Sequence, residues 1–135
     1  RGWSPHIWEL LNGADCITVS LLDAAAAIDC GDIYKKITVD IPRSALWDEI
    51  NDLIFSTEIQ LIEFAIKNFE NLKKYPQNSD TEVTYYPKRN PKDSEIDPNK
   101  PISEQFDLIR ACDPNRFPAR FYHRGEAYKI ILEKL

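Results

Sequence analysis

The chain has 135 residues, 43% of them hydrophobic and 29% charged, which is typical of one globular domain and excludes a disordered or fibrous protein. Its net charge of −5 disfavours nucleic acid as a partner, and short apolar runs without a leader predict neither a membrane span nor a signal peptide, so we expect a cytoplasmic protein. Three widely spaced cysteines argue against a disulfide framework and against a metal site.

The first predicted element is a short helix from Ser4 to Asn12. Ser4 can cap this helix, Pro5 suits its first position, and Gly13 stands where a left-handed residue ends a helix. The chain opens on Arg1 and contains no Met, and the helix follows at once. We therefore expect that this sequence lacks the beginning of its protein.

Two strands and a loop are predicted after the helix. Residues with branched side chains are concentrated at 17–22 and 32–41, which favours strands in both places. The connection at 23–31 contains turn-forming residues, among them Asp29 and Gly31. Its length leaves room for a functional loop.

A long amphipathic helix is predicted next. Apolar residues recur at three- and four-residue steps over 44–75, and Pro76 would end this helix. Residues 76–101 hold five of the nine prolines, so we expect a linker there, with one short strand at 83–86. Acidic residues follow the basic run at 88–92, which favours a solvated linker over a phosphate site.

The end of the chain is predicted as a small α+β unit. A brief helix is expected over 103–112, with apolar residues on one face. Apolar residues then alternate after a turn at Arg124-Gly125, which indicates a β-hairpin.

Two carboxylates in the first loop are candidates for chemistry. Asp29 and Asp32 flank Gly31 between two strands, and strand ends are where α/β enzymes place their sites. Both residues could instead form turns by accepting hydrogen bonds from nearby backbone. The four alanines at 24–27 carry no reactive side chains. They form either a loop without a function or a surface where backbone groups contact a flat ligand. Cys30 has no His near it in sequence, which disfavours a nucleophilic thiol.

Aromatic and cationic side chains are concentrated at 116–122, which holds three rings and two guanidinium groups. One interpretation is packing within the hairpin core. The other is that Phe121 and Tyr122 help to hold a nucleotide, with a ring on the base and an Arg near the diphosphate. Side chains alternate along a strand, so only one of this pair can face such a site.

Several motifs occur in the order expected of one family. The first half contains Arg1-Gly2-Trp3-Ser4-Pro5-His6-Ile7-Trp8, Asn12-Gly13, Ile17-Thr18-Val19 and Ile28-Asp29-Cys30-Gly31-Asp32-Ile33-Tyr34. The second half contains Tyr85-Tyr86-Pro87-Lys88-Arg89, Asp93-Ser94-Glu95-Ile96-Asp97, Leu108-Ile109-Arg110-Ala111 and Arg116-Phe117-Pro118-Ala119. With these motifs the chain resembles the 10-formyltetrahydrofolate-dependent formyltransferases, and it is more similar to their nucleotide-sugar branch than to the methionyl-tRNA branch.

The resemblance implies an α/β fold in three parts. Residues 1–75 would be the C-terminal part of a Rossmann-like formyltransferase domain, and 76–101 would be the linker. Residues 102–135 would form the small C-terminal subdomain with its β-hairpin.

The resemblance also implies site residues. Asp29 matches the family's catalytic Asp, which works with an Asn and a His that are absent from this sequence, so the chain alone is expected to be inactive. Most relatives carry longer or charged side chains in the folate loop, and here the contacts would come from the backbone. The residues expected to contact the folate are Trp3, Ala25, Ala26, Ala27 and Ile28.

The implied reaction transfers a formyl group from 10-formyltetrahydrofolate to the amino group of a nucleotide-linked deoxyamino sugar, for surface glycans such as lipopolysaccharide. Phe121 and Tyr122 would bind this acceptor. One alternative is methionyl-tRNA formylation, which the acidic charge disfavours. The other is a non-catalytic fragment whose hairpin serves a homodimer.

Overall fold

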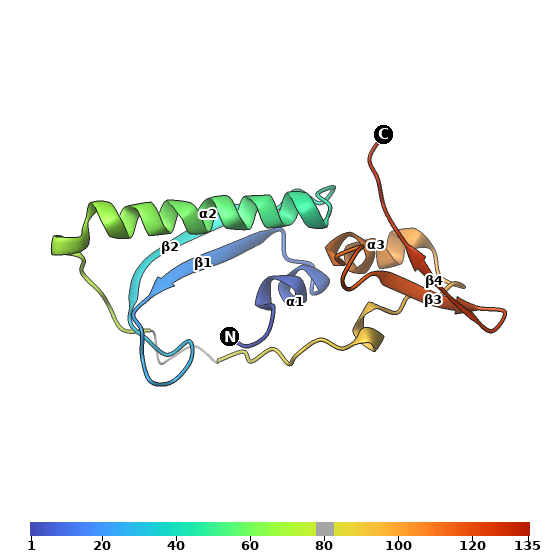
Figure 1. The fold of residues 1–135 in the computed structure, drawn as a ribbon, viewed down its shortest axis with the longest axis horizontal. Coiled ribbons are helices and arrows are strands. Elements are labelled where there is room, and N and C mark those ends of the chain that lie inside the picture. The colour runs from blue at the N-terminus through green and yellow to red at the C-terminus, as the bar shows by residue number, and fades with distance from the viewer. Residues whose placement is uncertain (78–82) are drawn as a thin grey trace.

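A computed structural model describes residues 1–77 and 83–135 of the chain. Its strands form two separate antiparallel pairs, β1 with β2 and β3 with β4. Figure 1 shows α2 lying along the first pair, with α3 and the second pair at the other end of the molecule. In chain order the elements are α1 (Pro5–Leu11), β1 (Cys16–Leu22), β2 (Ile33–Asp40), α2 (Trp47–Lys67), the 3-10 helix η1 (Phe69–Asn71), the 3-10 helix η2 (Pro91–Ser94), α3 (Ile102–Ala111), β3 (Ala119–His123) and β4 (Glu126–Ile130).

The first core lies between the β1–β2 pair and α2. Ile17 pairs with Val39 in the antiparallel register, which puts two apolar side chains on the face toward α2. On the opposite face the hydroxyl groups of Thr18 and Thr38 lie 2.9 Å apart and are exposed. This alternation is the period-two pattern of a half-buried pair, so both strand predictions are confirmed. The buried residues of this core are Leu10, Ile17, Ile41, Ala45, Ile50 and Ile54.

Helix α1 confirms the predicted start and stop, with one difference. Pro5 is its first residue, and Gly13 takes the left-handed conformation with φ of 86° beyond its end. Ser4 precedes the helix but has φ of 46° and makes no side-chain capping hydrogen bond. The predicted Ser4 cap is therefore wrong, because an N-cap side chain reaches the helix from extended backbone.

Helix α2 is shorter than predicted. The Glu49 carboxylate accepts a hydrogen bond of 2.8 Å from the Leu46 N–H and so satisfies a free donor at the helix start. The helix ends at Lys67, and the side-chain amide of Asn68 donates a further hydrogen bond of 2.8 Å to the Phe64 carbonyl at this end. The apolar pattern continues beyond this point without a packing partner, and Phe69 is 78% exposed.

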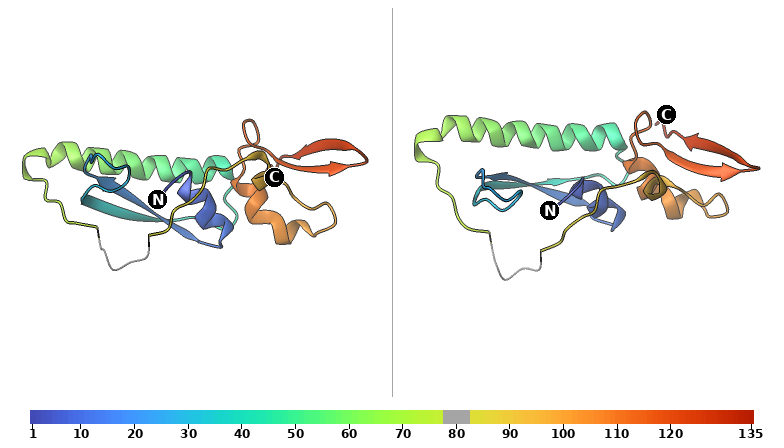
Figure 2. Two further views of the ribbon diagram at one scale, coloured as in Figure 1. Left: turned by 90° about the horizontal axis from the view of Figure 1, so that it is seen from below. Right: turned by 60° about the horizontal axis from the view of Figure 1, so that its bottom comes forward.

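The C-terminal unit combines α3 with the β3–β4 hairpin. Its buried residues are Ile96, Ile109, Cys112 and Ala119. Arg124 and Gly125 have φ of 52° and 85°, the two positive angles that a tight hairpin turn requires. The helix and hairpin predictions are thus confirmed, and Figure 2 shows the hairpin extending away from the rest of the molecule in both views.

Arg110 connects the C-terminal unit to the first part of the chain. Its side chain is 2% exposed, and its guanidinium donates to the carbonyl oxygens of Pro42 and Ala45, at 3.2 Å each. It also forms an ion pair of 2.6 Å with Asp107 on α3. This side chain therefore ties α3 to the segment that leads into α2.

The linker passes back along the first part of the chain. The predicted strand at 83–86 is wrong, since only Tyr86 pairs, in an isolated parallel bridge with Gly2. Residues 78–82 of the predicted linker lie outside the described residues.

The fold is a mixed α/β arrangement, as predicted. The described strands form no parallel sheet, so the Rossmann-like part of the prediction stays a prediction, as does the division at 75 and 101. No helix in the described part of the chain is long and apolar enough to cross a membrane.

Candidate active site

The β1–β2 loop is closed at its neck by polar contacts. The N–H of Asp23 donates to the carbonyl of Asp32 at 2.7 Å, and the Tyr34 hydroxyl donates to the Asp23 carboxylate at 3.1 Å. Lys74 forms ion pairs with both carboxylates. Its hydrogen bond, with that of Tyr34, holds the pKa of Asp23 below the usual value. The loop also requires Gly31, where a Cβ would overlap the carbonyl oxygen of Asp23.

The tip of this loop presents backbone and small side chains to solvent. All residues from Ala24 to Ile28 are exposed, and Ile28 is 79% exposed. An exposed apolar side chain beside exposed residues with small side chains could cover one face of a flat heterocycle, and the main chain could hydrogen-bond its edge.

Asp29 is held from two sides. Its backbone is left-handed, with φ of 59°, and its carbonyl accepts a 2.8 Å hydrogen bond from the side-chain amide of Gln77. The same amide reaches the carbonyl of Gly31 at 2.8 Å, and Arg1 in turn donates to the Gln77 side-chain oxygen. The Gly2 N–H lies 3.5 Å from one carboxylate oxygen of Asp29. Gln77 thus fixes the main chain of Asp29.

The segment from Arg1 to Trp3 connects Asp29 to a second feature. The Trp3 N–H donates to the Tyr86 carbonyl at 3.1 Å, and the Tyr86 N–H donates to the Arg1 carbonyl at 2.8 Å. Gly2 has φ of 102°, and a Cβ there would overlap the Tyr86 carbonyl oxygen, so only glycine allows this close pairing.

A pocket of about 520 Å³ lies between α1, the linker around η2 and the start of β3. We call it the cationic pocket, because Lys88, Arg89, Arg116 and Arg120 line it together with one carboxylate, that of Asp113. Exposed rings of Trp3 and Phe117 stand at its wall, and His6, whose pKa is lowered by burial, also lines it.

Two of the four cations have partners within the protein. Arg89 donates to the Asp93 carbonyl at 2.8 Å, and Arg120 pairs with Glu95 at 2.7 Å. Lys88 lies 5.0 Å from the centre of the Trp3 ring, and Arg116 lies 5.7 Å from that of Phe117. Among the described residues, neither Lys88 nor Arg116 is in an ion pair.

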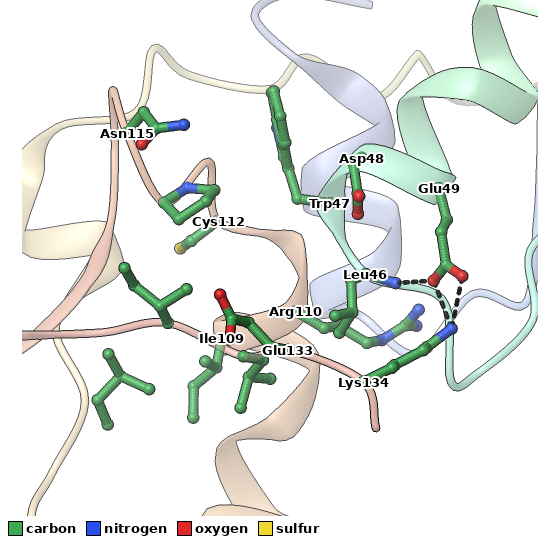
Figure 3. A pocket seen from close by; sticks show the side chains of 14 residues that line it. Leu46, Trp47, Asp48, Glu49, Ile109, Arg110, Cys112, Asn115, Glu133 and Lys134 are labelled. Atoms are coloured by element: carbon green, nitrogen blue, oxygen red, sulfur yellow. Dashed lines mark hydrogen bonds and ion pairs between the residues drawn. The ribbon is translucent and has the colours of Figure 1, made fainter.

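Another pocket, of about 480 Å³, lies where the chain end passes the start of α2 (Figure 3). Lys134 points at Glu49 in this view and forms an ion pair with it, which lowers the pKa of that carboxyl. Arg110 also lines this pocket, with its donors directed to Asp107 and to backbone carbonyls. The cations of this pocket are therefore already paired, and it is the weaker candidate for a ligand site.

The described residues contain no group of three or more His, Cys, Asp or Glu side chains that could hold a metal ion. Cys16 and Cys30 are exposed and Cys112 is buried, and all three are free thiols.

Comparison with known proteins shows what this chain is similar to. No protein-family model matches the chain. Methionyl-tRNA formyltransferase of Lactococcus lactis subsp. cremoris (strain MG1363) is 31% identical over 138 residues, which cover 100% of this chain and 42% of that protein. The chain is therefore similar over its whole length to part of a methionyl-tRNA formyltransferase. It spans less than half the length of the curated relatives that it matches.

Solved formyltransferase structures have a similar fold. A 4-N formyltransferase from Francisella tularensis has a TM-score of 0.78 at 23% identity, over 100% of this chain and 58% of that one. A sugar N-formyltransferase from Shewanella sp FDAARGOS_354 has a TM-score of 0.72 at 19% identity, over 98% and 55%. HypX from Aquifex aeolicus, in complex with tetrahydrofolic acid, has a TM-score of 0.72 at 20% identity, over 94% and 22%. The proteins that this chain resembles in sequence or in fold thus include both tRNA and sugar enzymes.

The structure brings together only some of the residues predicted for a formyltransferase site. Asp29 and Ala25–Ile28 share one loop, and the backbone of Gly2 contacts Asp29. The ring of Trp3 lines the cationic pocket. Its predicted folate contact stays a prediction, as do the roles of Asp29 and the loop residues.

The predicted acceptor-binding pair lies outside the lining of the cationic pocket. Phe121 stacks on Tyr128, with ring centres 5.5 Å apart, and packs against the C-terminal core. Tyr122 is 54% exposed, below the guanidinium of Arg120. The alternation of the strand therefore separates a packing ring from a solvent-facing ring, and their binding role stays a prediction.

Sequence reasoning passed over two residues that line this pocket, Lys88 and His6. The run containing Lys88 was interpreted as solvated linker because acidic residues follow it. In the fold this run lies beside Trp3, whereas Asp93 and Glu95 are occupied with Asn90 and Arg120. Lys88 belongs to the motif Tyr85–Arg89, which resembles the formyltransferase family, and this motif was the sequence signal that could have drawn attention to Lys88.

Proposed function

We propose that this chain is the C-terminal portion of an enzyme that transfers a formyl group from 10-formyltetrahydrofolate to the amino group of a nucleotide-linked deoxyamino sugar. The observation that carries the proposal is the placement of Asp29, which is fixed beside the Arg1–Trp3 segment. The same segment leads into a pocket lined by cations and aromatic rings. The candidate catalytic carboxylate and the cationic pocket are thus connected by a segment of three residues, Arg1 to Trp3.

The proposed chemistry needs a base and a stabilised oxyanion. The acceptor amine attacks the formyl carbon, a new C–N bond forms, and the bond from the formyl carbon to the folate nitrogen breaks. The amine loses one proton and the folate nitrogen gains one, so the products are an N-formyl sugar and tetrahydrofolate. Asp29 would orient the family's His or accept the proton through water. The family's Asn and His would stabilise the oxyanion.

The choice of Asp29 over Asp32 is supported by their contacts. Asp32 lies 3.7 Å from the Lys74 ammonium at the neck of the loop, where it has a structural partner. Among the described residues, the Asp29 carboxylate has only the Gly2 N–H nearby, at 3.5 Å from one oxygen. Asp29 therefore keeps capacity to accept a further hydrogen bond from a catalytic group or substrate.

The exposed loop from Ala25 to Ile28 fits a folate contact through backbone. Its side chains are small or apolar, and Ile28 leaves most of its surface in water. The pterin ring would bury this surface, with main-chain groups at the ring edge. This contact can be tested by adding folate to the complete protein and measuring the amide hydrogen exchange or the NMR chemical shift of Ile28. We expect both to change.

Methionyl-tRNA formylation is the second candidate, and the similarity to the Lactococcus enzyme favours it. The net charge of −5 argues against a tRNA partner, because phosphate binding needs a basic surface. We also propose a cytoplasmic location, a role in surface-glycan synthesis and a homodimer formed through the hairpin.

The test is a formyl-transfer assay with the complete protein that contains this chain. We expect release of tetrahydrofolate with a nucleotide-linked amino sugar and none with methionyl-tRNA. The isolated chain should show no transfer, because the family's Asn and His are not in it. Transfer by the isolated chain at the rate of the complete protein would contradict the assigned roles.

A further inference from the structure

The cationic pocket stands out against the charge of the whole chain. The protein carries 17 Lys and Arg residues against 22 Asp and Glu residues. Four of those cations and a single carboxylate line this one pocket. The carboxylate, on Asp113, already accepts backbone hydrogen bonds from Asn115 and Arg116, at 2.8 and 3.1 Å. Gathering like charges is unfavourable without an anion between them, so the pocket is suited to an anionic ligand.

Two further donors in the pocket wall lack a partner. The Nε atoms of Arg89 and Arg120 are buried and make no hydrogen bond among the described residues. Buried polar atoms in folded proteins are almost always hydrogen-bonded, to protein, ordered water or ligand, so these two donors are available to an acceptor. An anion with several oxygen atoms supplies such acceptors to more than one guanidinium.

The two cations without ion pairs each lie over an aromatic ring. Lys88 lies over Trp3, which is 59% exposed, and Arg116 lies over Phe117, which is 64% exposed. Large exposed rings beside cations offer stacking surface and positive charge together. A nucleoside diphosphate matches both, because its base has a flat face and its diphosphate carries negative oxygens.

The position of Trp3 indicates which end of a bound ligand would lie toward Asp29. Its neighbour Gly2 contacts the Asp29 carboxylate, so the Trp3 end of the pocket is the end nearer to Asp29. Phe117 comes from the segment before β3 and also lines the pocket. A sugar to be modified at Asp29 would therefore lie toward Trp3, and the base would lie at Phe117.

We propose that the cationic pocket binds the nucleoside diphosphate part of the acceptor, with Lys88 and Arg116 on the phosphates and Phe117 on the base. The identity of the acceptor rests on the proposed function, but binding of a nucleoside diphosphate does not require formyl transfer. A binding measurement without folate therefore fails separately from the transfer assay.

Uridine diphosphate, thymidine diphosphate and inorganic pyrophosphate are suitable probes, because Trp3 and Trp47 line the pocket and their fluorescence reports occupancy. We expect Lys88→Ala and Arg116→Ala each to weaken the binding of all three by about tenfold, the usual effect of losing a charged hydrogen bond. Phe117→Ala should weaken the binding of the two nucleotides by about tenfold and leave the binding of pyrophosphate unchanged, because only the nucleotides have a base that stacks on the ring.

Arg43→Ala is the matched control, since Arg43 is a largely exposed cation outside the pocket, 4.0 Å from Asp15. It should bind every probe as the unchanged chain does. Equal effects of Arg43→Ala and Arg116→Ala would overturn the proposal, since attraction would then come from charge in general. Binding of tRNA with a steep salt dependence, and of neither nucleotide, would also overturn it.

Discussion

The side-chain amide of Gln77 donates to the carbonyl oxygen of Asp29 at 2.8 Å, across 48 residues of sequence. It also donates to the carbonyl of Gly31 at 2.8 Å, so one side chain holds both ends of the Asp29 turn. The loop carrying the candidate base is thus fixed by a residue from beyond α2.

Replacing Gln77 by Glu should misplace Asp29, because the isosteric carboxylate cannot donate to the two carbonyls. We expect a fall in turnover of the complete protein of roughly tenfold or more, as small displacements of catalytic groups cause. Gln77 is a positioning residue, so the pH profile of the residual activity should keep its shape. Asn71→Asp makes the same change at an exposed site. A Gln77→Glu protein as active as Asn71→Asp would mean that this contact does not position the base.

Removal of Lys74 should change the titration of Asp23. The Lys74 contact lowers the pKa of Asp23, so this pair stabilises the fold above the usual Asp pKa of about 3.9 and loses that effect as pH falls through the lower folded value. Lys74→Gln should therefore raise the Asp23 pKa toward its usual range, and acidification should weaken the variant less than the unchanged chain. Carboxyl NMR titration measures this, with the neighbouring Lys73→Gln as control. An Asp23 pKa equal in all three proteins would show that the pair is not formed in solution.

Arg110 should be sensitive even to a conservative change. Its guanidinium serves Asp107 and the carbonyls of Pro42 and Ala45 at once. A Lys ammonium cannot copy this fork, so Arg110→Lys should lower the free energy of unfolding by about 1–3 kcal/mol. Urea denaturation checks this against Arg124→Lys in the exposed hairpin turn. Equal midpoints for the two variants would exclude a structural role for this contact.

Replacing the two aromatic residues of β3 should have different effects, one on stability and the other on substrate binding. Phe121 packs in the C-terminal core, so Phe121→Ala should lower the free energy of unfolding by about 2 kcal/mol. Tyr122 is exposed, so Tyr122→Ala should leave the melting temperature unchanged and raise the KM for the sugar nucleotide by about fivefold, if its hydroxyl contacts the ligand. An unchanged KM in Tyr122→Ala would contradict a role of this side chain in binding the sugar nucleotide.

Local patterns in the sequence predict much of this fold. Alternation at Ile17 to Leu22 and the turn at Arg124-Gly125 depend on neighbouring residues, and both predictions are confirmed. The end of α2 was missed because the apolar repeat continues through Phe69, where nothing in the described fold covers it. The apolar repeat shows which residues are apolar. It does not show where the helix ends, which is at the hydrogen bond from the Asn68 side chain to the Phe64 carbonyl.

The candidate site was predictable only where its residues are close in sequence. The loop around Asp29 carries its own motif. Gln77 has no local signal, and the motif around Lys88 does not reveal which residue it contacts. The contacts of these residues to Asp29 and Trp3 arise only when the linker returns along the first half of the chain. Contacts between segments so far apart require the three-dimensional structure.

The most direct measurement is the turnover of two matched variants of the complete protein, Asp29→Asn and Asp32→Asn. Each removes one negative charge from the same loop, and each keeps the size of the side chain. We expect Asp29→Asn to lower turnover by about a hundredfold or more, in line with general-base and electrostatic contributions. Asp32→Asn should have a much smaller effect, because Asp32 faces Lys74 at the neck. Equal losses in the two variants, or a greater loss in Asp32→Asn, would contradict the assignment of Asp29 as the catalytic carboxylate.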